Sequence, residues 1–196
     1  MGLISNGTTI FDNGSMASGF GGNLNFISKA TASASASIEF TLGDLKEYKF
    51  FFVNMHPATD DVEFQFNFST DSGSTYAVTK TSTYFYPYHD EADTSTGLTY
   101  YTTGDLAQST ANQALSYSLG NGNDESLSGE MSVFNPSSTT FVKHFIIRNN
   151  TYHKADFTQE RYVAGYANTT SALTNIKFQM SSGNIDAGEI LLFGVN

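Results

Sequence analysis

The stretch from Leu127 to Asn149 constrains the fold most, because two runs of alternating apolar and polar residues flank a turn. The turn begins at Asn135-Pro136. Proline has no amide hydrogen to give to a neighbouring strand, and asparagine tolerates turn geometry. This combination is typical of an antiparallel β-hairpin, so we expect a strand on each side of the turn.

The second strand of this hairpin carries large apolar residues on both faces. Phe141, Phe145 and Ile147 alternate on one face, while Val142 and Ile146 fall on the other. Side chains alternate between the two faces of a strand, and a strand that is apolar on both lies in the centre of a sheet or between a core and a partner. We therefore expect a central strand here.

Alternation of the same kind recurs at intervals of roughly 10 to 15 residues, with polar turns between the runs. In Val62–Phe68 it is clearest, and we expect one face of that strand to meet a core and the other to meet water. The other expected strands are Ala34–Leu42, Tyr48–Met55, Tyr76–Tyr86, Leu98–Tyr101, Leu115–Leu119, Tyr162–Tyr166, Ile176–Met180 and Ile190–Val195. A helical pattern is found only in Asp105–Asn112. We predict an all-β fold, a single antiparallel β-sandwich with at most one short helix.

The 196 residues suit one domain of this kind, which would bury roughly 70% of the surface of the unfolded chain. A core of that size needs no disulfide, and the chain has no cysteine. Residues 1–23 contain Asn-Gly and Gly-Gly turns between short extended pieces, so we assign them to an N-terminal arm and residues 24–196 to the sandwich domain. The expected anchors of the arm are its apolar residues Ile4, Ile10, Phe11 and Phe20.

Charged residues make up only 14% of the chain, and the formal net charge is -10. Contact with phosphate groups needs clustered Lys or Arg, and the nine that are present are scattered, so we expect no binding to nucleic acid or to an anionic membrane. No apolar run approaches the roughly 20 residues that cross a bilayer. Residues 1–10 lack the basic and apolar regions of a secretory signal, so we expect synthesis in a cytoplasm without export by that route.

Acidic side chains gather in three short segments. The residues from His89 to Asp93 could converge on calcium, but they lack the order of a calcium-binding loop, and we expect a solvated loop without metal. Asp60-Asp61 and Asp124-Glu125 are adjacent pairs whose side chains should point apart, so neither forms an acid/base pair. The sequence contains no motif of nucleophilic, metal-dependent or nucleotide chemistry, and we expect neither enzyme activity nor a cofactor.

Aromatic residues are abundant, with seventeen Phe and eleven Tyr. Two clusters of them exceed what alternation into a single core can bury, and their tyrosines are Tyr84, Tyr86, Tyr88, Tyr100 and Tyr101. Exposed tyrosines can stack on sugar rings or anchor a protein interface. The alternative is that these rings fill both faces of a sheet that a loop covers.

Several turn segments are distinctive beyond the strand pattern. They are Leu3–Ile10, Pro57–Asp60, Ser69–Tyr76, Phe134–Ser137 and Ser181–Ile185, with Phe193-Gly194 near the end of the chain. Together they resemble small virion proteins of marine and cyanobacterial tailed phages over nearly the whole length. The resemblance implies a jelly-roll-like domain on the outside of a phage particle. In that family the last strand commonly ends in Tyr-Gly, whereas here it ends in Phe193-Gly194, and no catalytic residues are carried over.

Our leading hypothesis is a virion protein made in the host cytoplasm, an exterior capsid decoration or cement protein without enzyme activity. It would assemble as a symmetric homo-oligomer, a trimer, and contact phage capsid or tail proteins through its arm. The alternative hypothesis is a tail-fibre module that recognises a host-surface glycan through the five tyrosines named above. A hydrolase is the third hypothesis, and it would need paired carboxylates in a cleft.

Overall fold

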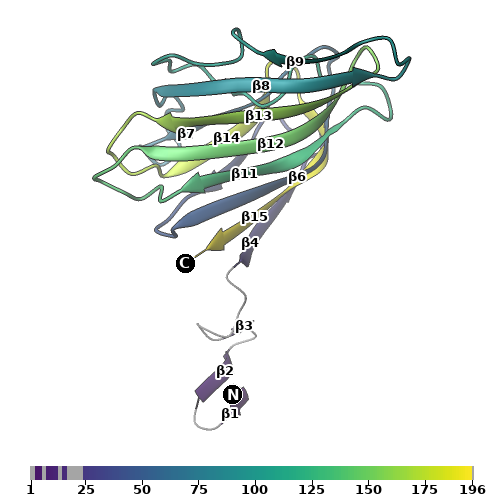
Figure 1. The fold of residues 1–196 in the computed structure, drawn as a ribbon. Coiled ribbons are helices and arrows are strands. Elements are labelled where there is room, and N and C mark those ends of the chain that lie inside the picture. The colour runs from purple at the N-terminus through teal and green to yellow at the C-terminus, as the bar shows by residue number, and fades with distance from the viewer. Residues whose placement is uncertain (1–2, 6–7, 13–14, 17–23, 196) are drawn as a thin grey trace.

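The computed structural model describes residues 3–5, 8–12, 15–16 and 24–195. All regular structure in these residues is β-strand, and residues 24–195 form two antiparallel sheets that pack together (Figure 1). The predicted all-β sandwich is therefore confirmed. Within residues 3–16, a separate three-stranded sheet contains β1 (Leu3–Ser5), β2 (Thr8–Asp12) and β3 (Ser15–Met16).

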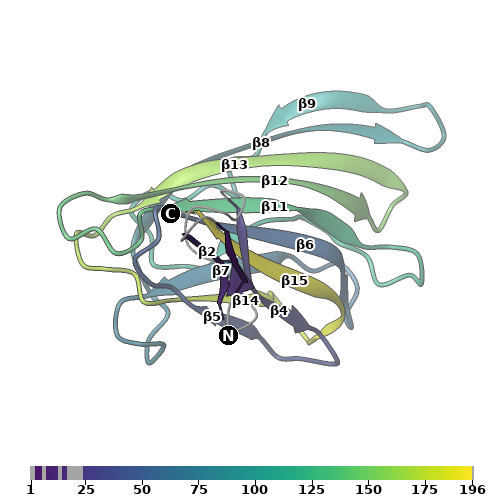
Figure 2. The same cartoon turned by 90° about the horizontal axis from the view of Figure 1, so that it is seen from below.

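The large sheet has eight strands, and in Figure 1 it is seen from the side that faces away from the small sheet. In spatial order the strands are β4 (Asn25–Thr31), β15 (Ile185–Val195), β6 (Glu47–Pro57), β11 (Leu127–Phe134), β12 (Lys143–His153), β13 (Phe157–Ala167), β8 (Lys80–Asp90) and β9 (Thr96–Tyr100). The small sheet has four strands, β10 (Gln113–Ala114), β7 (Phe64–Ser69), β14 (Asn175–Met180) and β5 (Ile38–Thr41). Figure 2 shows the small sheet on one side of the large one, with β8 and β9 at the far edge.

Strands from the two ends of the sandwich domain lie side by side. β15 pairs with both β4 and β6, and β14 pairs with both β5 and β7, so each late strand is inserted between two early ones. This crossed order brings the two ends of the sandwich domain together. It closes the domain only after the last strand has paired.

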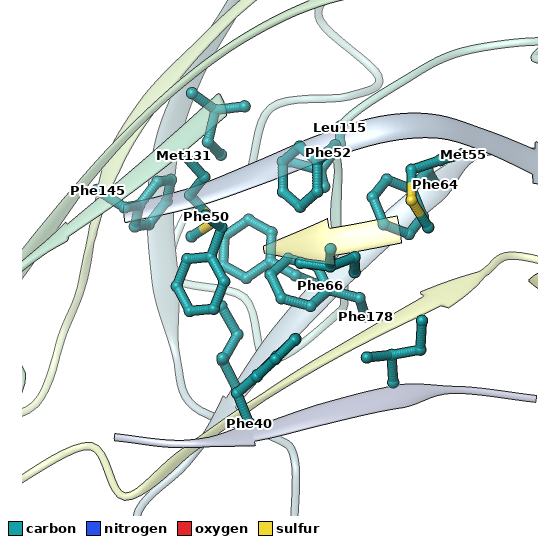
Figure 3. Close-up of a cluster of buried hydrophobic side chains, with 14 of the residues drawn as sticks. Phe40, Phe50, Phe52, Met55, Phe64, Phe66, Leu115, Met131, Phe145 and Phe178 are labelled. Carbon is teal, nitrogen blue, oxygen red and sulfur yellow. The ribbon is translucent and has the colours of Figure 1, made fainter. Parts of the chain in front are cut away.

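The core between the two sheets is dominated by phenylalanine (Figure 3). Phe178 on β14 lies at its centre, with ring centroids 5.3 Å from those of Phe50 and Phe52 and 5.8 Å from that of Phe64. All four side chains are buried. Aromatic rings at such separations gain edge-to-face or stacking energy beyond the burial of their area. The core thus joins β6 of the large sheet to β7 and β14 of the small one.

The predicted hairpin is confirmed as β11 and β12, which pair antiparallel with Val133 opposite Phe145. β12 is also central, as expected, since it lies between β11 and β13. Only one of its two apolar faces is buried. β12 begins at Lys143, Phe141 precedes it and is 70% exposed, and Ile146 on the outer face is 56% exposed.

The predicted helix at Asp105–Asn112 is wrong, because this segment forms turns beside β8. Ser109 exchanges two backbone hydrogen bonds with Lys80, and Leu106 accepts one from Ser82. Gln108 has a positive φ of 50°, which an α-helix does not allow. Backbone pairing with β8 therefore replaces the hydrogen bonds within a helix.

Several other expected boundaries differ from the structure. Asn25–Thr31 forms β4, which its weak alternation did not reveal, and β8 starts at Lys80 and extends to Asp90. The expected strand at Leu115–Leu119 is wrong, since Leu119 makes only isolated bridges there. On β7 the outer face was expected to be wet, but Asn67 is buried because Thr110 and Asn112 in the adjoining segment accept hydrogen bonds from its amide.

Candidate functional site

One face of the large sheet points away from the small sheet and is called the open face here. Its central row crosses all eight strands, with each residue directly opposite the next: Tyr100, Phe85, Tyr162, Arg148, Glu130, Phe51, Leu191 and Lys29. Residues directly opposite in an antiparallel sheet have neighbouring side chains on the same face. The open face is therefore a continuous surface of mixed aromatic, aliphatic and charged groups.

The open face concentrates exposed apolar side chains. Of the ten large hydrophobic residues that are exposed in the described part of the chain, six belong to it: Phe26, Val53, Phe85, Leu98, Tyr100 and Ile146. Leu98 is the most exposed, at 72%. These side chains are spread from β4 to β9, and their concentration on one face of the molecule favours an interaction surface.

Two shallow hollows interrupt the open face where small residues stand between large ones. One has a volume of about 420 Å³ and lies over Ala164, between Thr83, His144 and Ile146. The other, about 330 Å³, lies over Gly129 beside Phe51. A projecting side chain next to a hollow is the shape that two protein surfaces need in order to interlock.

Three ion pairs between described residues lie on the open face. Lys29 Nζ lies 2.6 Å from Glu189 Oε1, Lys49 Nζ lies 3.1 Å from Glu130 Oε2, and Arg148 forms an ion pair with Glu160. The chain as a whole carries a formal charge of -10. Two copies that approach through this face therefore meet less like-charge repulsion than the net charge implies.

On its opposite face, the large sheet holds a tyrosine cluster around Arg161, which we call the arginine cluster. Tyr84 and Tyr86 come from β8, Tyr101 follows β9, and Tyr117 comes from the segment that covers this end of the sheet. The guanidinium carbon of Arg161 lies 3.8 Å from the ring centroid of Tyr86 and 5.5 to 5.9 Å from the other three. Ring faces carry negative potential, so they attract the cation.

The arginine cluster is largely closed. Arg161 and Tyr84 expose none of their surface, while Tyr86 and Tyr101 are half-buried. Burial raises the pKa of the Tyr84 hydroxyl, so the group stays protonated. Burial also lowers the pKa of His153, to which the Arg161 charge adds a smaller effect.

The five tyrosines predicted to bind glycan do not form one surface. Tyr84 is buried, Tyr101 packs its ring against that of Tyr84 at 5.1 Å, and Tyr86 and Tyr88 line the same inner face. Tyr100 lies on the open face instead, where its hydroxyl donates to Asp105 at 2.7 Å. Alternation places Tyr84, Tyr86 and Tyr88 on the inner face and Tyr100 on the open face. Tyr84 is buried, so it cannot stack on a ligand.

The predicted anchors of the arm are described only in part. The backbone of Ile4 lies in β1, and the backbones of Ile10 and Phe11 lie in β2. Their side chains, and all of Phe20, lie outside the described residues. Their role as anchors stays a prediction.

The acidic segments form local contacts. The Nε2 atom of His89 lies 3.2 Å from Asp93 Oδ1. The Asp90 carboxylate accepts hydrogen bonds from Thr94 and Ser95. The hydrogen bond from the Thr94 side chain contributes most to lowering the pKa of Asp90 below its usual value. His89 and Asp90 belong to β8, so the predicted loop is shorter than expected. In the part of the chain that the structure describes, no three His, Asp or Glu side chains converge as metal ligands.

The two adjacent acidic pairs also have separate partners. Asp61 forms an ion pair with Lys154, and Glu125 accepts a hydrogen bond from the backbone of Gly122. Hydrogen bonding to Lys154 lowers the pKa of Asp61. These carboxylates stabilise turns and loop contacts.

Sequence reasoning missed the buried cations. Lys80 donates from Nζ to Asn67 Oδ1 at 2.6 Å and to the Val78 carbonyl at 2.8 Å, and burial lowers its pKa to about 7. Arg161 occupies an inward position of β13 between Gln159 and Val163. The sequence signal for its burial was that Arg161 lies two residues before Val163 on the same strand, so the two side chains point to the same face.

No described residue belongs to a helix that could cross a membrane. A scan against models of known protein families and a search of curated proteins found nothing that matches this chain.

Proposed function

We propose that the chain is a non-enzymatic structural protein of a phage virion, an exterior decoration or cement protein that assembles as a symmetric homo-oligomer through its open face. The observation that carries the proposal is the grouping of six exposed apolar side chains on that face. The place on a phage particle rests on the resemblance of the turn segments to phage virion proteins.

The shape and charge of the open face support self-association. Ile146 projects beside a hollow over Ala164, so one copy offers both a side chain and a site to receive it. The paired charges on the face can exchange partners between copies without leaving a charge unpaired. A side chain of one copy that enters the hollow of the next copy makes a head-to-tail contact, and contacts of this kind close into rings such as a trimer.

Assembly is tested by the mass of the full chain in solution. Size-exclusion chromatography with light scattering should give three times the mass of one chain at micromolar concentration. A mass that is another whole-number multiple of the mass of one chain would contradict the trimer but would still support self-association. The mass of one chain at every concentration would refute assembly through the open face.

Attachment to the particle is a separate part of the proposal, and it is assigned to the arm. Antibody labelling of purified phage particles should place the protein over the head. Removal of residues 1–23 should leave an oligomer with the same number of copies that no longer binds to capsids. Binding that survives the deletion would contradict the role of Ile4, Ile10, Phe11 and Phe20, and absence from particles would contradict the virion assignment.

A tail-fibre module that binds a host glycan is the second candidate. The observation that favours it is the pair of half-buried rings of Tyr86 and Tyr88, whose centroids lie 6.0 Å apart beside the arginine cluster. A glycan array would test it: saturable binding that Tyr88→Ala abolishes supports the module, and an array without signal removes it. Labelling at the tail would favour this candidate over the first.

A further inference from the structure

The side chain of Arg161 is buried with most of its hydrogen-bonding capacity unused. The residue exposes none of its surface. Its Nη2 donates to Gln159 Oε1 and, at 3.5 Å, to the Tyr117 carbonyl. Nε and Nη1 have no hydrogen-bond partner among the described residues. Arginine stays charged in proteins, so these are two buried donors on a full positive charge.

No carboxylate of the described residues forms an ion pair with Arg161. Arg148, the other arginine of the chain, pairs with Glu160. Glu63 is the acidic residue whose charge reaches the tyrosines of the cluster, and it accepts a hydrogen bond from Gln65 Nε2 at 2.7 Å. Four tyrosine rings surround the guanidinium instead.

A third donor in the same cluster is also without a partner. The Tyr84 hydroxyl is buried and makes no hydrogen bond to the described residues, and the centroid of its ring lies 5.5 Å from the Arg161 guanidinium carbon. An unsatisfied buried polar group lowers stability, and an unpaired buried charge lowers it more. The Tyr84 hydroxyl can accept as well as donate, but it carries no charge, so an anion is the partner that would match the two free guanidinium donors and their positive charge.

We infer that the arginine cluster binds a small inorganic anion of halide size, held by Nε and Nη1 of Arg161 and by the Tyr84 hydroxyl. One charge on the guanidinium favours a monovalent anion, and the enclosing rings favour a compact one. A water molecule would satisfy single hydrogen bonds but would leave the charge unneutralised. The bound anion stabilises the contact between β8, β13 and the covering segment that contributes Tyr117. This site does not depend on the proposed virion function.

Bromide, which scatters X-rays anomalously, is the probe that locates such an anion. Crystals of the full chain soaked in sodium bromide should give an anomalous peak at hydrogen-bond distance from Arg161 Nε or Nη1. Peaks confined to surface positions, an adventitious ion only, would overturn the inference. Water alone beside Arg161 would overturn it as well.

Chloride binding in solution tests the same site without crystals. At constant ionic strength and pH, replacing sodium gluconate with sodium chloride should raise the midpoint of thermal unfolding of the wild-type protein and should saturate. The Arg161→Met variant should lose this rise, whereas Arg148→Met, the control on the open face, should keep it. Equal chloride dependence in both variants would contradict the site.

Replacement of Arg161 can prevent folding, so a milder variant is needed. Tyr84→Phe keeps the ring and the cation but removes the hydroxyl. We expect it to fold and to bind chloride at least five-fold more weakly than the wild type. An unchanged chloride affinity would overturn the placement of the anion between Arg161 and Tyr84.

Discussion

The outer faces of the two sheets differ, although both sheets pack on the same core. The open face of the large sheet carries exposed apolar groups such as Leu98 and Ile146. The outer face of the small sheet carries polar groups, including Lys177 and Gln179 on β14, and its described residues include no exposed large hydrophobic. A face that only meets water is usually polar, so the contrast supports the proposal that the open face is an interface.

Tyr76, an aromatic residue beside the small sheet, makes contacts within the chain. Tyr76 lies over Lys177, with Nζ 4.6 Å from its ring centroid, and its hydroxyl donates to Glu39 Oε2 at 2.9 Å. On the open face, Phe85 stacks on Tyr162 with centroids 4.9 Å apart, and Phe85 remains 41% exposed. The aromatic ring beside the outer face of the small sheet is therefore held by contacts within the chain, whereas an aromatic ring on the open face remains partly exposed to solvent.

The largest expected effect comes from the core that both sheets share. Phe178→Ala should lower the free energy of unfolding by about 3–5 kcal/mol, because it removes a buried ring at the centre of the aromatic cluster. Lys177→Ala, one residue away on the outer face, should change it by less than about 0.5 kcal/mol. Urea unfolding of both variants measures the difference. Similar losses in the two would mean that the core is not organised around Phe178.

A charge placed on each outer face tests the contrast directly. Ile146→Glu should weaken self-association by about 10- to 100-fold, because the carboxylate would be buried without a partner in the interface. Gln179→Glu on the small sheet should leave self-association unchanged. Sedimentation equilibrium gives both dissociation constants, and urea unfolding of the dissociated chains shows that the fold persists. Equal effects from the two substitutions would erase the distinction between the faces.

A smaller effect comes from Lys80, whose side chain reaches from the large sheet to Asn67 on the small one. Its pKa is lowered to about 7 by burial, so above that pH the unfolded chain binds more protons than the folded chain. The stability should therefore rise as pH increases, by about 1 kcal/mol between pH 7 and pH 8. Lys80→Met should remove this rise. A wild-type stability that is flat or falls over this interval would contradict the buried, neutral lysine.

The sequence was sufficient to predict the sandwich, because alternation shows which face of a strand is buried. The hairpin of β11 and β12 and the aromatic strand β6 are examples. Alternation does not show whether the other face is covered, and so it left two alternatives for β12, a strand in the centre of a sheet or a strand between a core and a partner. The strand β4 was missed because its residues are mostly exposed at the edge of the sheet.

Side-chain clusters were harder to predict than strands. Tyr84 and Tyr100 are both tyrosines in an aromatic-rich region, and only the pairing of β8 with β9 places them on opposite faces. Arg161 approaches Tyr117 through a contact between distant segments. Contacts of this kind depend on the order of strands in the sheet and on the path of the covering segment that contains Tyr117. Local sequence patterns do not encode either of these.

Carbene footprinting of the assembled protein tests the central claim most directly, because it reports which side chains meet solvent. In the single chain, Leu98 and Ile146 are 72% and 56% exposed. If the open face is the interface, Leu98 and Ile146 should be labelled weakly in the assembled wild type. In the dissociated Ile146→Glu variant, Leu98 should be labelled strongly. Gln179, on the small sheet, should be labelled equally in the wild type and in the variant. Strong labelling of Leu98 and Ile146 in the assembled wild type would contradict the claim.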